Sequence, residues 1–220
     1  MPLPMMVRSL ICRFGGHSDI KRWSDARELL PEWEERTRLL ARLVQPSSHI
    51  LDFGAGSRTL QKYLTPDCTY LALDLVARSA DTFVCDLNSR PLPDLSSFHI
   101  DTAVFGGVLE YMQNLPELVG WLSKYVQCCI ASYECAQPPE NFWQHLRQRK
   151  ARASAGWVNN FQENEFVSLF EAQGLKLVRR EMWHTKGGDE PLFVFQKELD
   201  CVCPRSSHAE RQSIIPTIRR

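Results

Sequence analysis

The chain has 220 residues, of which 44% are hydrophobic and 24% are charged, and its formal net charge is zero. This size and composition suit one α/β domain with short extensions, large enough to fold without disulfides or metal ions. Balanced charge argues against a domain that holds long stretches of nucleic acid, since such domains usually carry a basic excess. We therefore expect no nucleic-acid partner.

The sequence also bears on compartment and metal binding. No apolar run is long enough to span a bilayer, and Arg8 interrupts the mildly apolar N-terminus, which makes it a poor signal peptide. We expect a cytoplasmic protein with reduced cysteines and no membrane partner. None of the eight cysteines forms a Cys-x-x-Cys pair or completes a zinc pattern, so no metal site is expected. Cys201 and Cys203 lie in a polar tail, where metal binding or oxidation is an alternative to free thiols.

The first predicted elements in chain order are helical. Residues 1–20 carry no clear pattern, and we expect an irregular segment there. Asp25 with Glu28 resembles a capping box, and Pro31 suits the first turn of a new helix. These signals predict a helical N-terminal extension over residues 21–45.

Strands and helices then alternate along the chain. This alternation predicts a Rossmann-like three-layer α/β sandwich with a seven-stranded, mostly parallel sheet. The last two strands are joined by a turn at Gly187-Gly188 without a helix, so we expect a C-terminal antiparallel hairpin. Residues 199–220 are polar, and we expect a flexible tail after a domain that spans residues 21–198. The strands are expected over residues 49–53, 69–75, 82–85, 101–105, 126–133, 175–180 and 192–196, and the helices over 57–64, 115–125, 140–152 and 163–172.

The most informative segment is Ile-Leu-Asp-Phe-Gly-Ala-Gly-Ser at residues 50–57, where a strand runs into a glycine turn. Gly54 and Gly56 allow a sharp bend and a close approach of a ligand to the main chain. Asp52 stands just before this turn. On its own the turn indicates only that a nucleotide-like ligand docks there.

Two further acids follow the next two strands. Asp74 ends the second strand, where an acid can accept hydrogen bonds from both ribose hydroxyls of a nucleoside. Asp86 follows the third strand, where it can accept from an adenine amino group. Ligands of open parallel sheets bind at the carboxyl ends of the strands. The three acids therefore predict a nucleoside-containing ligand at this edge of the sheet.

Taken together, these segments resemble the class I S-adenosylmethionine-dependent methyltransferases. The resemblance covers about residues 45–198 and implies that the protein is a methyltransferase with S-adenosylmethionine as its cofactor. One departure is Arg58, which stands where many members carry another glycine. The matching segments are Ile-Leu-Asp-Phe-Gly-Ala-Gly (50–56), Leu-Ala-Leu-Asp (71–74), Cys-Asp-Leu (85–87), Asp-Thr-Ala-Val-Phe-Gly-Gly-Val-Leu-Glu-Tyr (101–111) and Ala-Gln-Gly-Leu (172–175).

The resemblance also implies roles for individual residues in cofactor binding. The glycine turn with Asp52 would shape the pocket for the methionine part, Asp74 would bind the ribose, and the residues after the third and fourth strands would contact adenine and the sulfonium. The residues so implied are Asp52, Gly54, Gly56, Asp74, Leu75, Asp86, Leu87, Gly106 and Val108.

Methyl transfer from a sulfonium needs mainly an aligned nucleophile in a dry pocket, with a base if the nucleophile starts protonated. The candidates for this chemistry are Glu110, Tyr111 and Tyr133, after the fourth and fifth strands. A basic helix over residues 140–152, followed by Trp157, falls in a region (about 136–162) where such enzymes build a substrate cover. We expect a small-molecule acceptor, acidic or sugar-like, although a solvated charged face is the alternative interpretation of the basic run.

Two other functions remain as alternatives. A nicotinamide-dependent oxidoreductase shares the sheet and the glycine turn, but its Gly-x-Gly-x-x-Gly pattern would need glycine where this chain has Thr59. A non-catalytic methyltransferase-like binding protein also fits, because no base is unambiguous. The place of the Asn-Pro-Pro-Tyr loop of base methylases is occupied by residues 106–109, Gly-Gly-Val-Leu, which argues against that activity.

Overall fold

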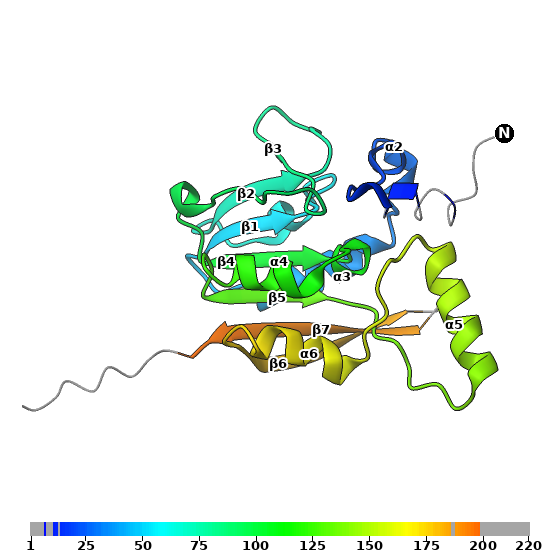
Figure 1. Ribbon diagram of the computed structural model, residues 1–220. Helices are drawn as coiled ribbons and strands as arrows, with labels where there is room; N and C mark the ends of the chain where they lie inside the picture. The colour runs from blue at the N-terminus through cyan, green and yellow to red at the C-terminus, as the bar shows by residue number, and fades with distance from the viewer. Residues whose placement is uncertain (1–6, 8–10, 13, 186–187, 199–220) are drawn as a thin grey trace, which may run out of the picture.

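A seven-stranded sheet forms the centre of the computed structural model, which describes residues 7, 11–12, 14–185 and 188–198. The strand order is β3-β2-β1-β4-β5-β7-β6 (Figure 1). All pairs are parallel except those of β7, which runs antiparallel to both of its neighbours. The predicted Rossmann-like fold with its C-terminal hairpin is confirmed. The strands are β1 (His49–Phe53), β2 (Thr69–Asp74), β3 (Phe83–Val84), β4 (Thr102–Gly106), β5 (Cys128–Ser132), β6 (Leu175–Thr185) and β7 (Gly188–Lys197).

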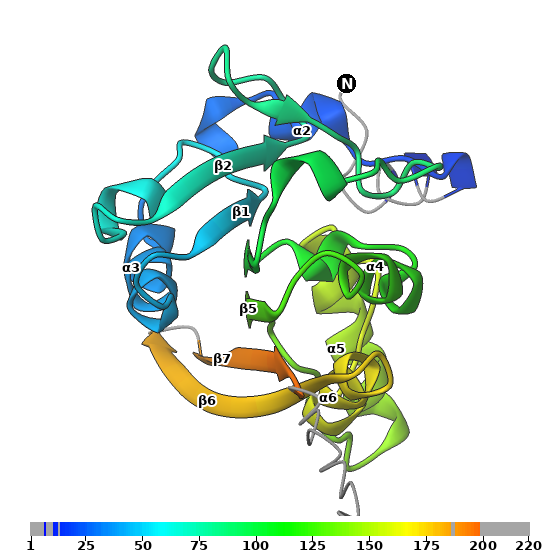
Figure 2. The ribbon, with the colours of Figure 1, turned by 90° about the vertical axis from the view of Figure 1, so that its left-hand side faces the viewer.

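Helices cover both faces of the sheet because successive strand residues point to opposite sides. In β1, Phe53 packs into the larger core with α4 (Leu115–Leu122) and α6 (Glu163–Glu171). Ile50 packs into a smaller core with α3 (Trp33–Leu43). Figure 2 shows α3 on one side of the sheet and α4 and α6 on the other. This arrangement gives the three layers that the sequence predicts.

The helix expected over residues 57–64 is wrong, and only the short 3-10 helix η2 (Leu60–Tyr63) is present. Gly56 and Arg58 have φ values of +51° and +59°, in the left-handed region that a right-handed helix does not contain. The Arg58 guanidinium also donates to Ser79 Oγ at 2.9 Å. Backbone conformation and this tertiary contact thus replace the expected helix by a turn.

The helical extension expected over residues 21–45 is present as short pieces. The Asp25 carboxylate accepts from the backbone N–H of Arg27 at 3.0 Å, and Glu28 pairs with Arg22 at 2.8 Å. The expected Asp25–Glu28 capping box is therefore wrong, because the Glu28 side chain is held by a cation from the preceding helix. The elements are α2 (Ile20–Trp23), η1 (Ala26–Glu28) and α3.

The expectation of an irregular segment over residues 1–20 is also wrong in part, because positions 11–12 and 14–15 are helical. The carbonyl oxygen of His17 accepts from the side chain of Gln113 at 3.2 Å. Partners this far apart along the chain leave no trace in a local pattern, which explains why the sequence does not predict this structure.

The hairpin strands β6 and β7 extend beyond the ranges 175–180 and 192–196 expected from hydrophobicity. Their pairing continues as far as Thr185 and Gly188, at the solvent-exposed end of the hairpin. Backbone hydrogen bonds between two antiparallel strands do not require apolar side chains, so the hydrophobic pattern alone does not set how far the pairing extends.

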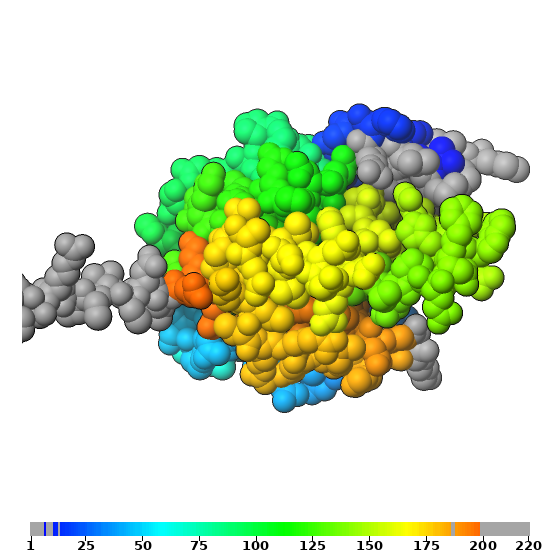
Figure 3. All heavy atoms as spheres, turned by 60° about the horizontal axis from the view of Figure 1, so that its bottom comes forward, coloured from blue at the N-terminus to red at the C-terminus, as the bar shows by residue number. Residues whose placement is uncertain are grey.

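The remaining helices lie at the two ends of the sheet. Among them, α5 (Phe142–Ser154) lies outside the sheet layers at the same end as α2 (Figures 1 and 3). No helix of the described residues is long and apolar enough to cross a membrane. The two other short helices are η3 (Ser96–Phe98) and η4 (Leu109–Tyr111).

Among the described cysteines, those at positions 68, 85, 128, 129 and 135 are free thiols. Burial raises the pKa of Cys85 and Cys128 to about 11, so these thiols stay protonated at neutral pH, as expected for structural cysteines. Cys201 and Cys203, with the rest of the expected tail over residues 199–220, lie outside the described residues.

Candidate functional site

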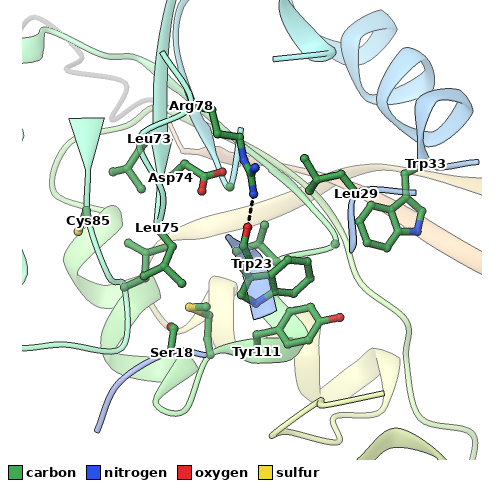
Figure 4. A pocket seen from close by; sticks show the side chains of 15 residues that line it. Ser18, Trp23, Leu29, Trp33, Leu73, Asp74, Leu75, Arg78, Cys85 and Tyr111 are labelled. Atoms are coloured by element: carbon green, nitrogen blue, oxygen red, sulfur yellow. Dashed lines mark hydrogen bonds between the residues drawn. The ribbon is translucent and has the colours of Figure 1, made fainter. Parts of the chain in front are cut away.

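Several hollows lie among the described residues at the carboxyl ends of the parallel strands, and three of them adjoin one another around the glycine turn and Trp33. The first hollow, of about 650 Å³, is bounded by the glycine turn, the end of β2 and the N-terminal segment (Figure 4). Two more adjoin it, the second of about 900 Å³ and the third of about 1410 Å³, and each volume includes space open to solvent. The first hollow is lined by Ser18, Trp23, Leu29, Trp33, Gly54, Leu73, Asp74, Leu75, Arg78, Cys85, Leu87, Gly107, Val108, Tyr111 and Met112.

The glycine turn forms one wall of the first hollow. Gly54 has a φ of +71°, and a Cβ atom at this position would lie 2.5 Å from Cγ2 of Val108. The backbone N–H groups of Gly54 and Ala55 donate to the carbonyl oxygen of Leu73 at 2.8 and 3.1 Å. Only glycine has the conformational freedom and the small size for this position. The turn is thus held open beside the end of β2.

Asp74 closes the adjoining wall at the end of β2. Its side chain is 7% exposed and lines the first hollow. The two carboxylate oxygens accept from the backbone N–H groups of Gly56 at 2.7 Å and Val76 at 2.9 Å. A carboxylate has about four acceptor positions, so both oxygens keep capacity for ligand hydroxyls. Asp74 is therefore fixed in place and still able to bind a diol.

Asp86 departs from the expectation that it faces adenine. Its carboxylate accepts from the N–H and hydroxyl of Ser18 at 2.8 and 2.6 Å, and from Asn88 N and Ser89 Oγ. These four hydrogen bonds use the acceptor positions of the carboxylate. The neighbouring Cys85 and Leu87 line the first hollow, while Asp86 ties the N-terminal segment to the loop after β3.

Asp52 lies in the second hollow, with Gly56 and Gly106. The Tyr70 hydroxyl donates to its carboxylate at 2.7 Å. Burial raises the pKa of Asp52 to about 7 against the effect of this hydrogen bond, and nearby Asp74 raises it further. Such a carboxylate favours a positively charged ligand group.

The N-terminal segment supplies a cover that the sequence does not predict. Trp23, Leu29 and Trp33 line the first hollow, and Figure 4 shows the Arg78 side chain reaching the carbonyl oxygen of Trp23. Trp23 also contacts Tyr111 edge to face, with ring centroids 5.1 Å apart. The signal in the sequence is the unexplained aromatic and apolar content of this segment.

The third hollow adjoins the first through the shared residues Trp33, Gly107 and Tyr111. Glu110 lies in its wall with 2% of its surface exposed. The loop that carries Trp157 is held there by a hydrogen bond from Val158 N to the Glu110 carbonyl oxygen at 2.9 Å. The hollow is lined by Glu32, Trp33, Arg36, Gly107, Glu110, Tyr111, Glu134, Trp157, Trp183, Thr185, Gly188, Asp189 and Glu190.

Comparison with known proteins decides the family of the chain. A family model described as a methyltransferase domain matches residues 22–180, which is well over half of the sequence. The chain belongs to this methyltransferase family. The match confirms the family and the enzyme class predicted from the sequence, and it removes the oxidoreductase alternative. No curated protein matches the sequence.

Solved structures share the fold of this methyltransferase at low sequence identity. The 1,6-didemethyltoxoflavin-N1-methyltransferase of Burkholderia thailandensis has a TM-score of 0.60 and 16% identity over 90% of this chain and 91% of the other. The N-methyltransferase NodS of Bradyrhizobium japonicum WM9 has a TM-score of 0.52 and 13% identity over 76% of this chain and 86% of the other. Both were crystallised with S-adenosylhomocysteine.

Two predicted features of the methyltransferase lie away from the hollows. Tyr133 is fully buried, its hydroxyl donates to Asn159 Oδ1 at 2.7 Å and accepts from Phe161 N at 3.0 Å, and its ring stacks on Phe166. Contrary to expectation, it therefore supports the core and does not line the third hollow. Arg58 likewise points away from the glycine turn, toward Ser79. It thus leaves the glycine turn unobstructed.

The basic run of the methyltransferase does not line the third hollow either. Arg147, Arg149 and Lys150 are exposed on α5, as the alternative of a solvated face had it. Arg152 is buried, where it donates to the carbonyl oxygen of Glu134 at 2.7 Å. The expectation that this helix binds an acidic or sugar-like acceptor lacks support, because its cations point to solvent or are already paired.

Proposed function

We propose that this methyltransferase binds S-adenosylmethionine in the first and second hollows and transfers the methyl group to a small-molecule acceptor in the third. The observation that carries the proposal is the wall that the first and third hollows share, formed by Trp33, Gly107 and Tyr111. A methyl donor in the first hollow and an acceptor in the third would both lie against these three residues, so their reacting atoms would be close together.

The residues of the first and second hollows fit the cofactor. Asp74 would bind the ribose hydroxyls, and Leu75 and Leu87 would pack against the adenine ring. Asp52 would stabilise the positively charged amino group of the methionine part. The remaining residues that we assign to the cofactor are Gly54, Gly56, Gly106 and Val108.

When bound, the cofactor supplies an electrophilic methyl group, because its sulfur leaves with the electron pair of the broken S–C bond while the acceptor's lone pair forms the new bond. Glu110 is suited to take the proton that the acceptor loses. Burial raises the pKa of Glu110 to about 7, with Glu190 adding to the effect, and Oε2 has no hydrogen-bond partner in the described part of the chain. Such a group accepts a proton near neutral pH. Tyr111 lines both the first and the third hollow, and we assign it the role of packing against the donor and the acceptor where they meet.

The proposal is tested by calorimetric titration with S-adenosylhomocysteine. Asp74→Asn keeps a side-chain acceptor for the backbone but loses the charge that strengthens bonds to the ribose. We expect its affinity to fall by about tenfold to a hundredfold. The control is Asp67→Asn, an exposed carboxylate that accepts from Ser47 far from the hollows, and its affinity should not change.

Two results would contradict this proposal. Failure of the unaltered protein to bind S-adenosylhomocysteine at millimolar concentration would exclude a functional cofactor site. An unchanged affinity of Asp74→Asn would show that the ribose is bound elsewhere.

A further inference from the structure

The third hollow has an excess of negative charge. Among the described residues that line it, carboxylates come from the residue that precedes α3, from the loops after β4 and β5, and from β7, while Arg36 is the single cation. A hollow with this charge attracts cations and repels anions. The carboxylates are those of Glu32, Glu110, Glu134, Asp189 and Glu190.

Arg36 offsets only one of these negative charges. Its guanidinium is partly engaged, because its buried Nε has no hydrogen-bond partner among the described residues. It donates to the carbonyl oxygen of Gly106 at 3.0 Å and faces the Glu190 carboxylate at 3.4 Å. It also lies over the rings of Trp33 and Trp183, at 5.4 and 5.5 Å from their centroids. Arg36 thus pairs with Glu190, and His184 Nδ1 lies 2.9 Å from the Asp189 carboxylate. No further cation lines the described part of the hollow.

Glu110 is an incompletely satisfied acceptor in this wall. Oε1 accepts from the backbone N–H of Glu134 at 2.9 Å, whereas Oε2 is buried and has no hydrogen-bond partner among the described residues. Buried carboxylate oxygens nearly always have a donor, since leaving one without a partner costs free energy. A ligand that brings a positively charged N–H donor would satisfy this oxygen.

Aromatic side chains form much of the rest of the lining. Trp33, Trp157, Trp183 and Tyr111 come from four separate segments and are half-buried. Indole and phenol rings stack with flat rings and attract organic cations through their π faces. They are poor ligands for a metal ion. The combination of acids and aromatic rings therefore favours an organic cation with a flat part.

We propose that the acceptor of this methyltransferase is an organic cation with an aromatic ring, whose charged N–H group donates to Glu110 Oε2 and whose ring packs among the tryptophans of the third hollow. The proposal rests on the proposed function, since it names the substrate class of that same site. It replaces the acidic or sugar-like acceptor expected from the basic helix.

The test compares three indole probes that differ in charge: tryptamine, a cation; tryptophol, neutral; and indole-3-acetate, an anion. Each is titrated calorimetrically into the full-length protein saturated with S-adenosylhomocysteine. We expect tryptamine to bind at least about tenfold more tightly than tryptophol, and indole-3-acetate to bind most weakly. In Glu110→Gln, tryptamine should fall to about the affinity of tryptophol. Glu171→Gln, which removes an exposed acid on α6, should change nothing.

A second measurement uses only the unaltered protein, so its result does not depend on whether a variant folds. Added sodium chloride should weaken binding of tryptamine to the unaltered protein and leave tryptophol unchanged, because salt screens the charge interaction. Equal affinity for the three probes, preference for indole-3-acetate, or no binding of tryptamine at millimolar concentration would overturn the inference. Failure of S-adenosylhomocysteine to bind would instead overturn the proposed function, so the two failures are distinguishable.

Discussion

Gly54 and Gly174 have similar left-handed backbones, with φ values of +71° and +78°, but different surroundings. A Cβ atom on Gly54 would meet Val108 Cγ2 at 2.5 Å, whereas no described residue lies within 4 Å of the same atom on Gly174. An alanine at either position would have a strained backbone, but only an alanine at position 54 would also overlap with a neighbouring side chain. Comparing the two variants therefore separates the cost of backbone strain from the cost of steric overlap.

We predict that Gly54→Ala destabilises the protein more than Gly174→Ala. Both changes bear left-handed strain of roughly 1–2 kcal/mol, and Gly54→Ala adds an overlap that costs a further 1–3 kcal/mol or so. Thermal unfolding measures the difference, and calorimetry should show S-adenosylhomocysteine affinity reduced at least about tenfold in Gly54→Ala only. Equal destabilisation of the two variants would mean that the Val108 side chain moves aside without a measurable cost in free energy.

At the scale of elements, contacts with the loops after β2 and β3 help to hold the segment from Ser18 to the start of α3 over the first hollow. Ser18 donates through its N–H and its hydroxyl to Asp86, and Arg78 donates to the carbonyl oxygen of Trp23. These contacts join the N-terminus to the loops after β2 and β3. The cover therefore depends on side chains of the sheet's own loops.

Asp86→Asn should loosen this cover, because an amide offers one acceptor oxygen where the carboxylate has two. Charge-assisted hydrogen bonds of this kind contribute about 1.5–3 kcal/mol, so we expect amide hydrogen exchange over residues 18–23 to accelerate about tenfold or more. Exchange in β1 and β4 should not change. The control is Asp94→Asn, because Asp94 also accepts hydrogen bonds from a nearby serine, Ser96, at the start of η3. Unaltered exchange in Asp86→Asn would show that other contacts hold the cover.

At the scale of the whole molecule, two buried carboxylates make stability depend on pH. Burial raises the pKa of Asp52 from 3.8 to about 7 and that of Glu110 from 4.5 to about 7. The folded protein thus holds these protons more tightly than the unfolded chain. The resulting stabilisation is fully present below the unfolded pKa values and is lost as pH rises through about 7.

We therefore predict that the free energy of unfolding of the ligand-free protein falls by roughly 2–4 kcal/mol between about pH 5 and pH 8. Denaturant unfolding at a series of pH values measures this slope. Asp52→Asn should remove about half of it, since an amide does not ionise, and the exposed Glu171→Gln should leave it unchanged. A slope of the opposite sign in the unaltered protein would contradict the prediction.

The sequence by itself determined the fold class, the family and the part of the site built from local segments. Each strand and helix is predicted by the hydrophobic pattern of a few neighbouring residues, and the same is true of the glycine turn between β1 and η2. Gly54 and Asp74 therefore stand where the pattern predicts them, at the carboxyl ends of neighbouring strands.

Only the tertiary structure decided what surrounds these residues. It buried Tyr133 in the core, used Asp86 to hold Ser18, and turned the basic face of α5 to solvent. It also brought acids and tryptophans from several elements together in the third hollow. Such contacts join residues far apart in the chain, and no local periodicity records them, so the chemistry of the acceptor site became visible only in three dimensions.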